Sequence, residues 1–273
     1  MSEKGYLVRL EPLKKMVECA LFSPYIKDEK PISLLITAKP ESGKTSVMKE
    51  YRQNKGILYL TDCTAYGIEQ NYLHRIVQGE IRTLMIPDLL TPLAKQTKTR
   101  RTFVAFLNSL IEDGIAGVAT GAFVWNKNTD ASVNVITSVT DQALRDARHG
   151  WAKLGFLSRF IIFSYSYSRS SVYEILRRYS IHGLEEASSQ KKKLKLPRKS
   201  VKVELSSELA DRLDPVAIRI GEQHNLYGFR AKINFRNLLK CLAVRNGRKV
   251  VTESDFQEFI ELADFMNSDY HPI

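Results

Sequence analysis

The segment that most constrains this chain is AKPESGKT, residues 38–45. An apolar run at 32–36 precedes it and predicts a short buried strand, and residues 46–51 predict the start of a helix. A phosphate-binding loop needs this strand–loop–helix context, because backbone N–H groups and a helix N-terminus then surround the phosphates. The alternative, a chance Gly-Lys-Thr on a surface turn, does not explain the apolar strand.

Each residue type in this loop has a physical reason to be there. Gly43 lacks a Cβ, so the backbone can approach an anion closely. Lys44 would reach the β- and γ-phosphates of ATP, and the Thr45 hydroxyl would hold Mg²⁺. Ala38 stands where such loops usually begin with glycine, a departure that many of them tolerate. The residues that we expect to bind nucleotide are Ala38, Ser42, Gly43, Lys44, Thr45 and Ser46.

The net charge of the chain favours an anionic partner. The 273 residues carry a formal charge of +11, which suits nucleic acid but says nothing about fold. The three cysteines are scattered and form no CxxC pair, so neither a zinc site nor a disulfide framework is expected. No apolar run approaches the roughly 20 residues of a membrane span, and the N-terminus lacks a signal-peptide core. We therefore expect a cytoplasmic protein without a membrane partner.

Strands and helices alternate along the first two thirds of the chain. Apolar runs at 56–62 and 84–90 predict further strands, and residues 117–125 and 132–139 are expected to pair as a hairpin across a turn at 126–130. Helical patterns lie at 11–21, 67–77, 102–112, 141–152 and 171–179. This alternation predicts an α/β fold with a central, mostly parallel sheet flanked by helices.

Helices alone are predicted after the sheet. A basic segment at 188–203, which contains Pro197, is expected to link a core of residues 1–187 to an α-helical lid of residues 204–273. The segment contacts phosphates or serves as a flexible linker, and its composition favours the linker. Helical patterns in the lid lie at 207–225, 229–246 and 252–265, the last with a near capping box, Thr252 and Asp255.

Nucleotide hydrolysis needs more than a phosphate loop: an acid that holds the metal, a group that positions water, and positive charge at the transition state. Asp88 ends an apolar strand about forty residues after Lys44 and is the candidate acid, because Mg²⁺ sites pair the loop hydroxyl with such an aspartate. The alternative is an aspartate that only ends a strand.

With these elements in this order, residues 10–265 resemble the AAA+ ATPases. Residues 38–45 match the Walker A segment, and residues 84–88 look like Walker B. Ser138 lies where the family has its sensor 1 residue. The sequence FLSRF, residues 156–160, is similar to the arginine-finger segment of the branch that includes the minichromosome-maintenance helicases and magnesium chelatases, which makes Arg159 the candidate finger. That branch also has a β-hairpin before sensor 1, as residues 117–132 would form here.

The resemblance extends to the C-terminal helices, where Arg236 is similar to sensor 2 and Arg230 is a second candidate. One position departs from the family: Leu89 stands where a glutamate orients the attacking water. Asp62, after the second strand, is the candidate substitute. Otherwise hydrolysis is slow, or the protein is an ATP-binding switch.

The resemblance implies an ATPase that assembles into a homo-oligomeric ring, a hexamer, and acts on DNA in the replication of a phage or mobile element. A switch that recruits or loads a replicative helicase, and a protein remodeller that does not touch DNA, are the alternatives. The basic stretch at 95–101 is a DNA contact or a solvated surface. Tyr165 and Tyr167 are expected in the core or in an interface.

Overall fold

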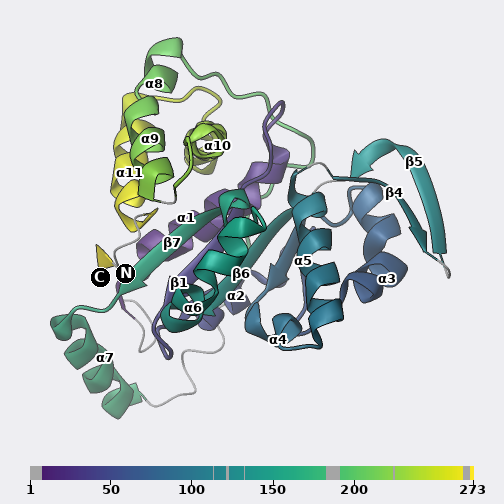
Figure 1. Cartoon of the computed structure of the whole chain (residues 1–273). Helices are drawn as coiled ribbons and strands as arrows, with labels where there is room; N and C mark the ends of the chain where they lie inside the picture. The colour runs from purple at the N-terminus through teal and green to yellow at the C-terminus, as the bar shows by residue number, and fades with distance from the viewer. Residues whose placement is uncertain are drawn as a thin grey trace.

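A parallel sheet forms the centre of the molecule. The computed structural model describes residues 8–112, 114–120, 123–131, 133–182, 191–223, 225–266 and 271–273. In them the sheet has the strand order β2-β3-β6-β1-β7-β8, and every pairing is parallel (Figure 1). The predicted α/β class with a parallel sheet is confirmed. The strands are β1 (Ser33–Ala38), β2 (Ile57–Tyr59), β3 (Thr83–Ile86), β6 (Asn134–Thr140), β7 (Phe160–Ser166) and β8 (His271–Pro272).

Helices cover both faces of the sheet, which is why its strands read as continuous apolar runs. Leu34 and Ile36 of β1 belong to a hydrophobic cluster with α1, α2 and α9–α11, whereas Leu35 belongs to a second cluster with α3, α5 and α6. The helices are α1 (Glu11–Phe22), α2 (Lys44–Tyr51), α3 (Ala65–Val77), α4 (Leu90–Leu93), α5 (Thr97–Glu112), α6 (Asp141–Lys153), α7 (Arg169–His182), α8 (Ser207–Asp211), α9 (Asp214–Gln223), α10 (Phe229–Arg245) and α11 (Glu253–Ala263).

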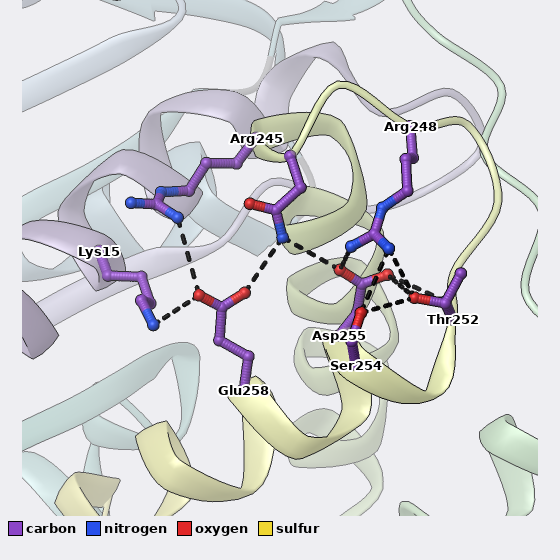
Figure 2. A network of polar contacts seen from close by, with 8 residues as sticks. Lys15, Arg245, Arg248, Thr252, Ser254, Asp255 and Glu258 are labelled. Carbon is purple, nitrogen blue, oxygen red and sulfur yellow. Dashed lines mark hydrogen bonds and ion pairs between the residues drawn. The ribbon is translucent and has the colours of Figure 1, made fainter.

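The C-terminal helices are tied to the N-terminal helix α1, which lies between them and the sheet (Figure 1). The Lys15 ammonium of α1 pairs with the Glu258 carboxylate of α11 at 2.5 Å, beside a network centred on Asp255 (Figure 2). Asp255 accepts from the Thr252 N–H (2.9 Å) and from Arg248. The capping box predicted at Thr252 is confirmed.

The basic segment before the C-terminal helices is held in place over residues 191–203. Lys192 pairs with the Glu18 carboxylate, and its backbone N–H donates to the Glu50 carbonyl (2.9 Å). Leu194 and Leu196 pack against the first cluster. Apolar side chains thus attach these residues to the first cluster, and an ion pair attaches them to α1. Their role as a flexible linker stays a prediction. Residues 183–190 lie outside the described residues. A lid that forms a separate domain stays a prediction, since one hydrophobic cluster runs through α1, the sheet and α9–α11.

The hairpin differs from its predicted pairing. Strand β4 (Ile115–Thr120) pairs antiparallel with β5 (Phe123–Ala131), and the two form a separate sheet. The turn predicted at 126–130 is wrong, because these residues extend β5. Polar residues that favour turns are accepted in a strand when a partner strand is available. The strand predicted as the second arm, β6, joins the central sheet instead, although a hairpin does precede it within residues 117–132.

Two helix boundaries also differ from expectation. Most of the basic stretch at 95–101 is the first part of α5, which begins at Thr97. The single helix predicted at 207–225 is two helices, α8 and α9. Pro215 lies in the first turn of α9, where a missing N–H costs nothing, whereas it would disrupt a helix interior. No helix in the described part of the chain is long and apolar enough to cross a membrane.

Candidate functional site

The phosphate loop connects the buried strand β1 to helix α2, as the sequence predicts. The strand ends at Ala38 and the helix begins at Lys44. Gly43 precedes the helix with φ +89°, in the left-handed region that glycine adopts without the steric cost of a Cβ. Ser42 is buried, whereas Thr45 and Ser46 in the first turn of α2 are half-buried. The helix N-terminus and the loop backbone thus meet at the end of β1.

Lys44 is folded back over the loop. Its ammonium donates to the carbonyls of Ala38 and Lys39, both at 2.8 Å, and to the Ser42 hydroxyl at 3.1 Å. Burial lowers the pKa of Lys44 to about 8, while the charges of Asp141 and Asp88 oppose that shift. The loop therefore holds a largely buried cation, and two carboxylates are near enough to stabilise its charge.

Two tyrosines, one near the end of β7 and one just after it, form hydrogen bonds with the loop. The hydroxyls of Tyr165 and Tyr167 both donate to the Ser42 carbonyl at 2.9 Å. Burial raises the pKa of the Tyr165 hydroxyl, so it remains a proton donor. The sequence interpretation placed these side chains in the core or in an interface. Their bonds to the loop were missed, because only the parallel pairing of β7 with β1 brings them together.

Asp88 lies two residues beyond β3, at the edge of the sheet that carries the phosphate loop. The carboxylate is exposed, and one oxygen accepts from the Leu90 N–H at 3.0 Å. Ser138 on β6 is buried between β3 and β1, and its hydroxyl donates to the Pro87 carbonyl at 2.6 Å. Ser138 also accepts the Leu89 N–H through its carbonyl (3.0 Å). Ser138 therefore fixes the segment that carries Asp88.

Asp141 belongs to this site, and the sequence interpretation did not single it out. Thr140, the last residue of β6, pairs with Ala38, the last residue of β1, and Asp141 follows as the first residue of α6. Its side chain is 11% exposed and pairs with Arg145 at 3.3 Å. The signal that could have identified it is an acid directly after an apolar strand, the same signal that identified Asp88.

Asp62 lies far from the phosphate loop. It follows β2, which is separated from β1 by β3 and β6, a lateral distance of about 14 Å at ordinary strand spacing. Its carboxylate is paired with the Lys95 ammonium at 2.9 Å. Asp62 thus follows an edge strand that is three strand positions away from the strand leading to Lys44.

Arg159 and Arg230 meet at the opposite edge of the sheet. Arg159 precedes β7, whose first residue, Phe160, pairs with Ser33 at the start of β1. The Glu112 carboxylate binds both guanidinium groups, Arg159 at 3.4 Å and Arg230 at 3.2 Å. The six residues of β1 separate this cluster from the phosphate loop, which is about 20 Å. Neither arginine can reach the loop of its own chain.

Arg236 lies on the same side as this cluster. Its guanidinium pairs with Glu29 at 3.1 Å, and Lys240 pairs with the same carboxylate at 2.5 Å. Glu29 precedes β1, so Arg236 is also distant from the loop that follows β1. The structure thus separates the expected catalytic and nucleotide-binding residues. The loop and Asp88 lie at the carboxyl ends of the strands, and the three arginines lie at the other ends.

These placements rest on the chain's own geometry. No protein-family model matches the chain, and a search of curated proteins found no match to it.

Proposed function

We propose that this chain binds ATP together with Mg²⁺ at the loop of residues 38–45. The observation that carries the proposal is the conformation of that loop. A left-handed Gly43 ends it at the N-terminus of α2, and a buried Lys44 lies over its carbonyls. Backbone N–H groups at a helix N-terminus and a nearby ammonium form a site for polyphosphate.

Thr45 and Asp88 fit the role of magnesium ligands. Both offer oxygen atoms, the donors that Mg²⁺ prefers. Among the described residues, no group of three or more His, Cys, Asp or Glu side chains could hold a metal. This agrees with an ion that takes most of its ligands from phosphates and water. The ion would neutralise charge on the β- and γ-phosphates.

Asp88→Asn tests this assignment. The variant removes the negative charge but keeps the shape, so we expect the gain in ATP affinity on adding Mg²⁺ to be lost, while metal-free binding is retained. Isothermal titration with and without Mg²⁺ measures both. Asp62→Asn, an exposed aspartate on the far strand, is the matched control. If the two variants bind Mg–ATP as wild type does, Asp88 does not hold the metal.

We infer further that the chain is an AAA+ ATPase that hydrolyses ATP in a ring. Ser138 lies on the strand between the phosphate loop and Asp88, where a sensor 1 residue would act. Arg159 is about 20 Å from its own loop, by the length of β1, so a finger role requires the loop of a second chain. A head-to-tail contact of this kind is heterologous, and it forms a ring when its rotation closes. A non-hydrolysing switch is the alternative, because Leu89 replaces the glutamate.

DNA is the proposed substrate of this motor, on the basis of charge at the start of α5. Lys98, Arg100 and Arg101 are exposed within the first five residues of α5. Positive side chains at a helix N-terminus oppose the helix dipole, so the stability of the helix does not explain them. An anionic partner such as the DNA backbone would explain why positive side chains lie at this helix N-terminus.

Replacing Lys98, Arg100 and Arg101 by alanine is expected to weaken DNA binding and its salt dependence. If each neutralises one phosphate, the slope of log K against log salt falls in magnitude by about 2.7. Fluorescence anisotropy across a salt series measures the slope. The charge-matched control replaces the exposed Lys193, Lys195 and Lys199. Equal effects from both triple variants would show that the net charge, and not this site, drives binding. An unchanged slope would exclude α5 as a DNA contact.

A further inference from the structure

The proposed hydrolysis lacks a carboxylate for the attacking water. The Leu89 side chain is buried in the second hydrophobic cluster. A side chain at this position therefore packs in the core and does not reach the phosphate loop. Asp62 is held by Lys95 on the far side of β3. The carboxylate must therefore come from another strand end.

Asp141 is the carboxylate in the right place. Strand β6, which it follows, lies between the strand of the phosphate loop and the strand of Asp88. The parallel register puts Thr140 beside Ala38, about 5 Å apart at normal strand spacing. Ala38 in turn accepts a hydrogen bond from the Lys44 ammonium at 2.8 Å. Asp141 and Asp88 thus follow neighbouring strands, β6 and β3, at the end of the sheet that carries the Lys44 loop.

The side chain of Asp141 is fixed in orientation. One oxygen accepts from the backbone N–H of Gln142 at 2.9 Å, and the other pairs with Arg145. Both interactions come from its own helix, α6. A carboxylate oxygen has two acceptor positions, so each retains one for water. Preorganised groups of this kind are what a positioned base requires.

We propose that Asp141 is the catalytic carboxylate that orients the attacking water, in place of the missing glutamate. This inference rests on the proposed ATPase function. The water oxygen bonds to the γ-phosphorus as the bond from that phosphorus to the β,γ-bridging oxygen breaks. The bridging oxygen keeps the electron pair and leaves with ADP. Asp141 accepts the proton that the water gives up and returns it to the medium.

Asp141→Asn is the direct test, because it removes the charge and the basicity but keeps the shape. Single-turnover hydrolysis with protein in excess should slow by about 10²–10⁴-fold, the usual contribution of a general base. ATP affinity measured by titration calorimetry should stay the same or rise, since a negative charge near the phosphates is lost. Asp62→Asn should hydrolyse ATP as wild type does.

Arg145→Ala distinguishes a catalytic role of the Asp141 carboxylate from a structural role of its ion pair in α6. It removes the ion pair of Asp141 but leaves the carboxylate and its hydrogen bond from the Gln142 N–H, so hydrolysis should fall by less than in Asp141→Asn. Equal losses in Asp141→Asn and Arg145→Ala would overturn the proposal, because they would assign the effect to the ion pair. If Asp141→Asn does not fold, Asp141→Ser keeps a good helix-start residue and is expected to show the same loss.

The outcomes distinguish this inference from the proposed function. A wild-type chain that binds no ATP would refute the ATPase itself. ATP binding with wild-type hydrolysis in Asp141→Asn would refute only the role of Asp141. ATP binding without hydrolysis in the concentrated wild-type protein would also refute that role, and would leave a nucleotide switch.

Discussion

Lys44→Ala is expected to weaken ATP binding about 10- to 100-fold, because a charge-assisted hydrogen bond contributes roughly 1.5–3 kcal/mol and 1.4 kcal/mol is a factor of ten. In the proposed complex the ammonium would leave the loop carbonyls of Ala38 and Lys39 and bind the phosphates. Lys49→Ala, an exposed lysine on the same helix α2, is the control and should bind as wild type does. Calorimetry measures the affinity, and circular dichroism checks the fold. Equal affinity in the two variants would refute the phosphate loop.

The same substitution changes how stability depends on pH. Burial lowers the pKa of Lys44 to about 8 in the folded chain. Above that pH, up to the ordinary lysine value, the unfolded chain binds more protons than the folded chain, so this residue makes stability rise with pH. Lys44→Ala lacks this contribution. Chemical denaturation of both proteins across that range should therefore show a shallower rise in the variant. Parallel curves would mean that Lys44 is not desolvated.

The strand–loop–helix geometry of residues 33–51 was predictable because its signals are local. An apolar run gave β1, and the Gly-Lys-Thr sequence gave the turn into α2, where Gly43 has the left-handed backbone that glycine favours. The alternation of strands and helices gave the α/β class for a similar reason, since each element shows its own periodicity.

The rest of the site was not predictable, because it depends on strand register. Asp141 lies next to Ala38 only through the pairing of β6 with β1, across about a hundred residues of sequence. Tyr165 reaches the Ser42 carbonyl through the pairing of β7 with β1. No local pattern encodes which strands become neighbours in a parallel sheet, where long connections join the strands.

The predicted boundaries of the hairpin were wrong for a related reason. The stretch 126–130 is rich in Asn, Asp and Lys, which favour turns in isolation. In the structure β5 continues through it, with Asn126 opposite Gly117 on β4. Pairing with β4 therefore keeps these residues in an extended strand, because strand propensity depends on the neighbouring strand.

Arg159→Ala is expected to keep ATP affinity and to lose most turnover, because a finger supplied to a neighbouring site contributes about 10³–10⁵ in rate. Its guanidinium cannot lose its proton and suits contact with phosphate oxygens. In the single chain it is bound to Glu112, together with Arg230. Glu112→Gln weakens this attachment but keeps the arginine, so it is the matched control and should retain turnover.

Mixing Arg159→Ala with Lys44→Ala subunits decides whether the finger acts between chains. Each variant alone should be inactive, one without a finger and the other without a loop lysine. In a mixed ring, some interfaces join an intact loop to an intact Arg159, so part of the ATP turnover should return. Turnover per subunit of wild type should also fall on dilution. If Arg159 serves only its ion pair with Glu112, the mixture stays as inactive as its components and dilution has no effect. That result would refute the ring even if ATP binding is established, because a cation about 20 Å from its own loop then has no nucleotide to act on.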